Sequence, residues 1–241
     1  MSALAERLEL VRQKISDACR RANRAPNAVT LVAVSKTHPI ATLQEAISYG
    51  QIHFGENRVE EAAGKIEAMG RGVVWHMIGH IQSRKAKDVL SLFEYVHSLD
   101  SSKLAERFSR LIGEGQGNWQ PLHIFLEINV SGELSKSGLM AAKWQDNRAV
   151  REALWAEVRQ IAALPYLQLE GVMTMAPVVE QADQARPVFA SLRELRDALA
   201  ADFPQHSWEH LSMGMTDDYE VAIEEGATMV RIGRAIFGER D

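Results

Sequence analysis

Lys36 has the clearest potential for chemistry, because it ends a run of apolar and β-branched residues. The run is Val29-Thr30-Leu31-Val32-Ala33-Val34-Ser35, which predicts a buried strand. A lysine at the end of such a strand keeps its stem in apolar packing, and desolvation of its amine lowers the amine's pKa. Such an amine can form a Schiff base with an aldehyde. The alternative for this segment is a strand-end lysine whose amine extends into solvent.

A second group of residues, near the C-terminus, could bind a phosphate. Ser212-Met213-Gly214 and Gly233-Arg234 each come at the end of an expected strand. They offer a hydroxyl, backbone N–H groups and a helix start to a dianion, and Arg234 could add charge. The glycines could instead serve only tight turns. Together with Lys36, this pattern indicates a phosphorylated aldehyde held as an imine, either pyridoxal phosphate or a phosphosugar.

Other candidate sites are weaker. His76 and His80 have the i,i+4 spacing of a helical metal pair, but a strand and a glycine interrupt it, so no metal site is expected. Cys19 falls on an apolar helical stripe and is expected to fill space rather than to act as a nucleophile. The basic run at residues 83–87 is expected to be a solvated helix face, with a phosphate or partner patch as the alternative.

Composition narrows the class of protein. A chain of 241 residues with 46% hydrophobic content suits one α/β barrel or two small domains, and we expect one domain over residues 1–241. A net charge of −5 argues against nucleic-acid binding. A single cysteine suits a reducing compartment. The sequence shows no signal-peptide hydrophobic region and no run near the roughly 18 apolar residues of a membrane span. We therefore expect a soluble cytoplasmic protein without membrane contact.

Strands and helices are expected to alternate along the chain. The expected strands are residues 29–36, 51–55, 73–79, 93–99, 122–130, 167–174, 208–213 and 227–232. The expected helices are residues 2–23, 39–50, 56–69, a stretch from about 81, 101–112, 148–164, 181–201, 216–226 and a last turn from 233. This pattern predicts a parallel (β/α)8 TIM barrel with an extra N-terminal helix. An open doubly wound sheet is the alternative, weakened by the lack of G-x-G-x-x-G after the first strand.

In a barrel, the carboxyl ends of the strands surround one mouth, where reactive groups belong. The polar residues expected there are Lys36, Glu56, Asn57, Gly79, His80, Asp100, Asn129, Thr174, Ser212, Gly233 and Arg234. The polar Gly/Ser loop at residues 131–138 is too long for a tight connection, and we expect it to be a functional loop.

Several segments also resemble the pyridoxal phosphate homeostasis protein family. They are VAVSKT at 32–37, HFGEN at 53–57, WHMIGHIQ at 75–82, NVSGE at 129–133, GVMTM at 171–175, LSMGMTDD at 211–218 and VRIGRAIFG at 230–238. The resemblance runs in the same order over about residues 1–240. It implies a single barrel related to the N-terminal domain of alanine racemases.

The resemblance further implies pyridoxal 5′-phosphate held as an internal aldimine on Lys36. It implies that the phosphate lies against Ser212, Met213, Gly233 and Arg234, with Asn57 and Arg231 near the ring. An arginine beside the pyridine nitrogen keeps that nitrogen unprotonated and weakens the ring as an electron sink. Arg234 departs from the family, in which many members carry Thr or Ser.

Two functions of different classes follow. In the first, the protein binds and hands over pyridoxal phosphate without committed turnover, and so affects amino-acid and keto-acid metabolism; apo enzymes that use this cofactor are the candidate recipients. In the second, it is a racemase or decarboxylase. The racemases that resemble this fold take one proton-transfer group from a C-terminal domain and partner subunit, for which this chain, ending at Asp241, has no room. We therefore favour a monomeric carrier with no catalytic residue. A Schiff-base aldolase acting on a phosphosugar is a third, weaker possibility.

Overall fold

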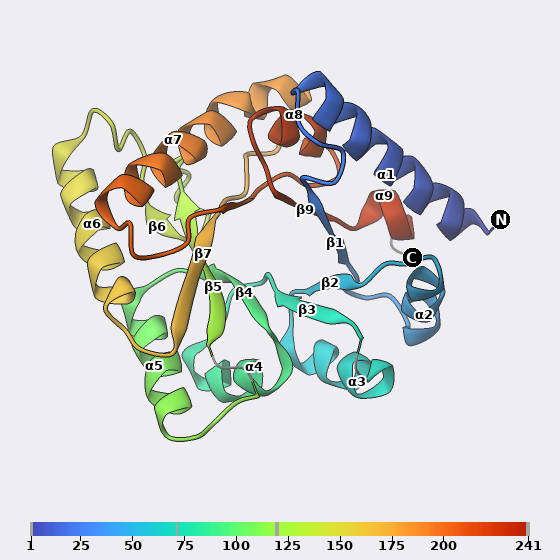
Figure 1. Ribbon diagram of the computed structural model, residues 1–241, viewed down its shortest axis with the longest axis horizontal. Coiled ribbons are helices and arrows are strands. Elements are labelled where there is room, and N and C mark those ends of the chain that lie inside the picture. The colour runs from blue at the N-terminus through green and yellow to red at the C-terminus, as the bar shows by residue number, and fades with distance from the viewer. Residues whose placement is uncertain (1, 71, 119–120, 240–241) are drawn as a thin grey trace.

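The computed structural model describes residues 2–70, 72–118 and 121–239, so Asp241 lies outside the described part. Eight parallel strands close into a barrel in the order β4-β3-β2-β1-β9-β8-β7-β5, and β4 pairs with β5 to complete the ring. These strands are β1 Thr30–Val34, β2 His53–Glu56, β3 Val74–Met77, β4 Tyr95–Leu99, β5 Leu122–Asn129, β7 Leu167–Met173, β8 His210–Ser212 and β9 Met229–Ile232. Figure 1 shows this ring with helices around it. The predicted TIM barrel is confirmed.

The helices cover the outside of the barrel (Figure 1). They are α1 Ala3–Arg21, α2 Ile40–Ser48, α3 Val59–Met69, α4 Ala86–Leu92, α5 Ser102–Gly113, α6 Arg148–Ala162, α7 Arg186–Asp202, α8 Tyr219–Glu224 and α9 Arg234–Phe237, with single 3₁₀ turns at Ser83–Lys85 and Ala182–Ala185. α1 is the extra N-terminal helix. Ser2 caps it by accepting a hydrogen bond from the Ala5 amide at 3.2 Å, and Arg7 Nε donates to the Ile236 carbonyl at 2.7 Å. The Arg7 bond fixes α1 against α9.

Some boundaries differ from the sequence-based expectation. α3 begins at Val59 rather than at residue 56 because Glu56 is the last residue of β2 and is fully buried. A short strand that was not predicted, β6 (Leu139–Met140), follows the 131–138 loop and pairs in parallel with β5. Two residues carry too little periodicity to predict a strand.

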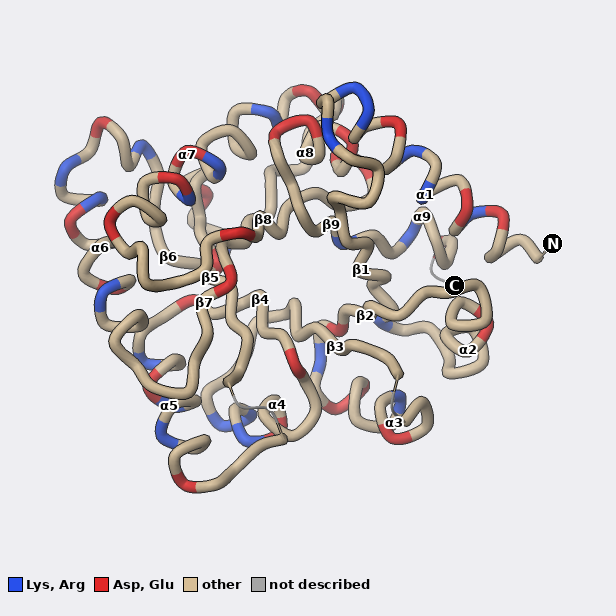
Figure 2. The backbone as a smooth tube through the Cα atoms, in the orientation of Figure 1, with Lys and Arg blue, Asp and Glu red and all other residues tan. Residues whose placement is uncertain are grey.

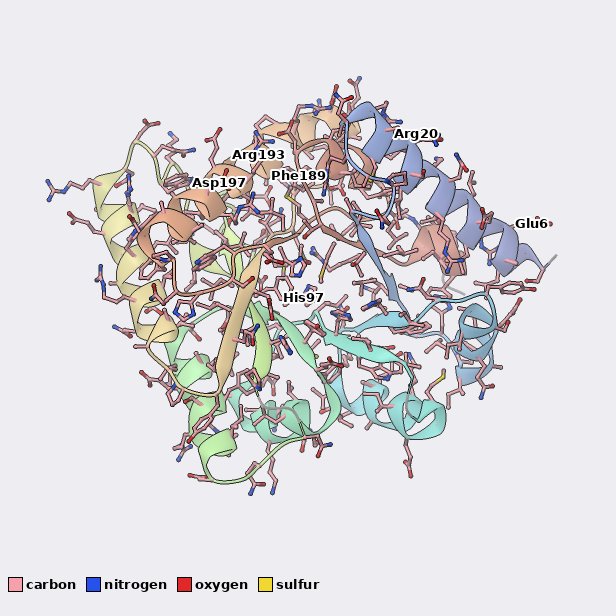
Figure 3. All side chains as sticks on the ribbon, in the orientation of Figure 1. Glu6, Arg20, His97, Phe189, Arg193 and Asp197 are labelled. Atoms are coloured by element: carbon pink, nitrogen blue, oxygen red, sulfur yellow. The ribbon has the colours of Figure 1, made fainter. Side chains whose placement is uncertain are left out.

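Two apolar regions fill the molecule. The larger one lies between the strands and the helices, as expected for buried helix stripes facing a barrel. The smaller one contains Phe125, Met173 and Met229, and Tyr95 and Met175 pack against it. Buried polar side chains, such as that of His97, share the interior of the ring of strands (Figure 3). Ser212 joins this polar interior to Arg231, which lines the site described below.

The outer surface carries charges of both signs along the helices (Figure 2). In α1, for example, Glu6 and Arg20 lie on the outside of the molecule (Figure 3). No helix in the described part of the chain has the length and apolar character needed to cross a membrane.

Candidate functional site

A cavity of about 480 Å³ opens at the carboxyl ends of the strands. Its lining residues come from β1, β9 and the segments that follow β1, β2, β3, β7, β8 and β9: Val34, Lys36, His38, Asn57, Ile78, Met175, Met215, Thr216, Asp217, Arg231, Gly233, Arg234, Gly238 and Glu239. A parallel barrel brings these ends to one mouth although they are distant in sequence. Five of the seven predicted site residues meet here, namely Lys36, Asn57, Arg231, Gly233 and Arg234.

Lys36 lies in a turn rather than at the last position of the strand. β1 ends at Val34, and the His38 amide donates to the Ser35 carbonyl at 3.1 Å to close the turn. Lys36 is half-buried and lines the cavity. The next residue, Thr37, has a φ of 68°, a left-handed conformation that is uncommon for residues other than glycine. The expectation that the strand itself ends on the lysine was therefore wrong, but the side chain reaches the mouth.

Asn57 follows β2 and contributes a buried, unpaired oxygen. Its Oδ1 atom has no hydrogen-bond partner among the residues that the structure describes. Gly79 lies against its backbone: a Cβ added to Gly79 would come 2.3 Å from the Asn57 carbonyl oxygen and 2.7 Å from its Cα. Only a glycine allows this approach, so Gly79 sets the position of Asn57.

Arg231 is the most deeply buried charged residue of the lining, with 4% exposure. Its Nη1 atom donates to the carbonyl and the hydroxyl of Ser212 at 2.7 and 2.8 Å, and Nη2 donates to the Thr174 carbonyl at 2.9 Å. Burial lowers its pKa to about 10, and the charges of Glu127 and Asp218 oppose this shift. Arg231 is therefore held in place and remains protonated at neutral pH.

Ser212 and Met213 do not line the cavity. Both are fully buried. The Ser212 hydroxyl contacts Arg231, and the Met213 amide donates to the Met229 carbonyl at 3.1 Å. The two residues thus lie behind the lining, and a direct contact with a phosphate stays a prediction for both.

Gly233 and Arg234 form the start of α9. A Cβ at Gly233 would meet the Val34 carbonyl oxygen at 3.2 Å, so glycine suits this close approach. The first amides of a helix have no acceptor within the helix and remain available to an anion. The Arg234 side chain instead reaches Asp217, with Nη2 2.7 Å from Oδ1 and 2.5 Å from Oδ2.

A chain of three histidines, of which His97 and His76 are fully buried and His53 is half-buried, extends from Arg231 through the barrel interior. His97 Nδ1 lies 2.8 Å from Ser212 Oγ, His97 Nε2 lies 2.9 Å from His76 Nδ1, and His76 Nε2 lies 3.0 Å from His53 Nδ1. Burial lowers the pKa of His76 and of His97 well below the ordinary value. Both rings are therefore neutral, with one donor and one acceptor nitrogen each, as such a chain requires.

The metal expectation concerned His76 and His80, which do not share a site. His76 belongs to the buried chain, whereas His80 is 60% exposed and its Nδ1 lies 3.1 Å from Asp100 Oδ2. Within residues 2–70, 72–118 and 121–239, no group of three or more His, Cys, Asp or Glu side chains is arranged to hold a metal ion.

Sequence reasoning missed several parts of this site. The histidine chain joins residues on β2, β3 and β4 whose side chains point inward, and only the closed barrel reveals that they meet. Glu127, on β5, is also buried. Burial and the charge of Asp100 raise its pKa to about 7, while Arg231 lowers it. Glu127 is a carboxylate within the long apolar run of β5, and this position in the sequence could have indicated that it is buried.

The 131–138 loop has internal support from Asn129, whose Oδ1 atom accepts from the Gly132 amide at 2.9 Å and the Ser131 hydroxyl at 3.1 Å. The loop leads into β6. A functional role for this loop stays a prediction.

Comparison with known proteins places the chain in a family. The alanine racemase N-terminal domain family matches residues 7–241. The pyridoxal phosphate homeostasis protein of Pseudomonas aeruginosa is 43% identical, covering 100% of this chain and 97% of its own length, and that of Escherichia coli is 40% identical, covering 100% and 98%. PipY of Synechococcus elongatus, solved with PLP bound, superposes with a TM-score of 0.80 at 36% identity, covering 98% of this chain and 100% of that one.

More distant structures share the fold alone. An alanine racemase of Clostridium difficile matches with a TM-score of 0.64 at 11% identity, covering 93% of this chain and 57% of its own. The homeostasis proteins and PipY, in contrast, are 36–43% identical to this chain over almost the full length of both proteins. The chain therefore belongs to the pyridoxal phosphate homeostasis protein family, which is built on the alanine racemase N-terminal domain.

Proposed function

We propose that this protein binds pyridoxal 5′-phosphate in the cavity at the barrel mouth and acts in the homeostasis of this cofactor. The observation that carries the proposal is the convergence of Lys36, Asn57 and Arg231 on one cavity. The membership of the family and the PLP-bound structure of PipY support it.

The residues present fit this group. A volume of about 480 Å³ lies within the range of small-molecule sites. The buried Asn57 Oδ1 atom lacks a partner, which is costly unless a ligand supplies a donor. Lys36 offers an amine, and the N-terminal end of α9, at Gly233 and Arg234, lines the same cavity. An aldehyde, a polar ring and a phosphate would each find a matching group.

Lys36 is the residue that we propose to bind the cofactor covalently. Its amine nitrogen would add to the aldehyde carbon and form an imine, with the aldehyde oxygen leaving as water. Bound pyridoxal phosphate supplies an electrophilic carbon next to an electron-withdrawing ring. The half-buried place of Lys36 would limit the access of bulk water to the new bond.

The phosphate would lie against Gly233 and the first turn of α9, close to the segment that carries Asp217. Arg234 would act there indirectly, because its guanidinium is paired with Asp217 at the rim. Ser212 and Met213 would support the site from behind through Arg231 and β9.

Arg231 would determine the character of the ring nitrogen. Its charge persists at neutral pH, because a pKa of about 10 leaves the guanidinium protonated, and a guanidinium donates hydrogen bonds but accepts none. A ring nitrogen beside it would accept a hydrogen bond and stay unprotonated. This suits storage of the cofactor better than carbanion chemistry, which needs the ring as a strong electron sink.

We therefore propose a carrier that hands pyridoxal phosphate to apo enzymes, acts as a monomer and resides in the cytoplasm. The alternative is a PLP-dependent racemase or decarboxylase. The likeness to alanine racemase and diaminopimelate decarboxylase, at 11% and 10% identity, concerns the fold alone.

Titration with pyridoxal phosphate tests binding. We expect the wild type to develop an imine absorption band that the Lys36→Ala variant lacks, and equal spectra for the two proteins would contradict the proposal. The loaded protein is then mixed with an apo PLP-dependent enzyme, whose recovered activity measures transfer. Incubation with L-amino acids in heavy water distinguishes the carrier from the racemase or decarboxylase. Exchange of the Cα hydrogen that depends on Lys36 would indicate an enzyme.

A further inference from the structure

An ionic cluster, two of whose three members are buried, lies directly behind the turn that carries Lys36. It consists of Glu56 at the end of β2 and Glu61 and Lys65 on α3. Lys65 is only 6% exposed, which is unusual for a lysine on a helix. Its Nζ atom lies 2.7 Å from Glu56 Oε1 and 2.6 Å from Glu61 Oε1. Burial of the Lys65–Glu56 ion pair costs desolvation energy, which further hydrogen bonds of the two groups must offset.

This cluster holds the backbone on both sides of Lys36. Lys65 Nζ donates to the Ser35 carbonyl at 2.8 Å. Glu61 Oε1 accepts from the Thr37 amide. Glu56 Oε1 adds a bond from the Ser35 hydroxyl at 2.7 Å. The residues before and after Lys36 are thus tied to the same helix.

The conformation of Thr37 shows why such a restraint is needed. Its φ of 68° is left-handed, and a residue with a Cβ keeps this conformation only where its surroundings impose it. The side chain of Thr37 is exposed, so packing does not impose it. The turn closed by the His38 amide and the Ser35 carbonyl requires it, and the acceptor on Glu61 holds the Thr37 amide in the direction that this turn gives it.

We propose that Glu61 and Lys65 are positioning residues for Lys36, holding its two neighbouring peptide groups so that the side chain is directed into the cavity. The proposal rests on the proposed function only in assigning Lys36 to the cofactor aldehyde. Lys65 itself would not react, since its ammonium group is already surrounded by three acceptors.

The chain offers a matched control on the same helix. Glu60 and Glu61 are both in the first turn of α3, so removal of either carboxylate changes the interaction with the helix dipole in a similar way. Glu60 pairs with Lys85 on the outside, with Oε1 2.7 Å from Nζ, and is 65% exposed. A Glu60→Ala variant therefore changes helix charge without touching the Lys36 turn.

Two readouts test the proposal. The first is hydrogen–deuterium exchange of the Thr37 amide in the protein without added ligand: we expect about tenfold faster exchange in Glu61→Ala and no change in Glu60→Ala. The second is the rate at which added pyridoxal phosphate forms an imine on Lys36, trapped with borohydride and mapped by mass spectrometry. We expect it to fall about tenfold in Glu61→Ala, with partial recovery in Glu61→Gln, whose amide oxygen can still accept from Thr37.

The outcomes separate this proposal from the proposed function. If the wild type forms no imine on Lys36, the proposed function fails, while faster Thr37 exchange in Glu61→Ala alone would still support the restraint. If the wild type labels Lys36 and Glu61→Ala does so at the same rate, with unchanged Thr37 exchange, the positioning role is overturned. Equal losses in Glu60→Ala and Glu61→Ala would overturn it too, because they would reflect the helix as a whole.

Discussion

Replacement of Gly79 by alanine should lower both the free energy of unfolding and the affinity for pyridoxal phosphate, because it adds one Cβ atom next to Asn57. The added Cβ would lie 2.3 Å from the Asn57 carbonyl oxygen. Ordinary contact begins near 3.4 Å, so the two backbones must separate by about 1 Å. Such overpacking costs about 1–3 kcal/mol of unfolding free energy. For a protein of this size that is a fall in Tm of roughly 2–12 °C.

The effect on binding follows from the same displacement. Asn57 lines the cavity and has an unpaired Oδ1 atom, so a shift of about 1 Å should remove its hydrogen bond to a ligand and weaken affinity for pyridoxal phosphate about tenfold. Thermal unfolding and absorbance titration measure the two effects.

Gly64→Ala is the matched control. Gly64 lies within α3, and a Cβ there would meet nothing within 4 Å. Alanine is the better helix former by about 0.5–1 kcal/mol, so Tm should rise slightly while affinity stays unchanged. A Gly79→Ala protein with the Tm and affinity of the wild type would refute the reasoning.

Three further predictions concern charged groups. The free energy of unfolding should fall as the pH drops below about 6.5, the ordinary histidine pKa. Burial lowers the pKa of His97, so its ring stays neutral in the folded protein but takes up a proton in the unfolded one. Urea titrations between pH 7 and 5 should show a less steep loss of stability in a His97→Gln variant. Arg231→Met should raise the pKa of Glu127 above about 7, since the arginine charge lowers it; carbon-13 NMR of the Glu127 carboxyl would show an unchanged midpoint if this is wrong. Arg234→Ala should change the unfolding free energy by less than about 1 kcal/mol, because its pair with Asp217 is exposed; a larger loss in denaturant unfolding would contradict this.

The architecture could be predicted from the sequence because each strand is a short apolar run with turn residues at its ends. Lys36 and Gly233-Arg234 could be placed at the mouth for the same reason, since the carboxyl end of each strand is readable from the pattern. The exact end of β1 could not be predicted from the sequence, because the turn at Lys36 depends on the hydrogen bond from the Thr37 amide to Glu61 on α3.

The supporting groups depend on contacts between distant segments. Lys65 is four residues after Glu61 and resembles an ordinary surface pair on a helix. Its spacing of three residues from the buried Ala62 was a signal that it faces inward. The contact of Ser212 with Arg231 rather than with the cavity could not be read from either motif, because it requires the register of β8 against β9.

The most direct test of the central claim is borohydride reduction of the purified protein loaded with pyridoxal phosphate, followed by mass mapping of the labelled peptide. The account predicts one dominant label, on Lys36, and its loss in Lys36→Ala. A label that persists on another lysine in that variant, with an unchanged absorption band, would contradict it.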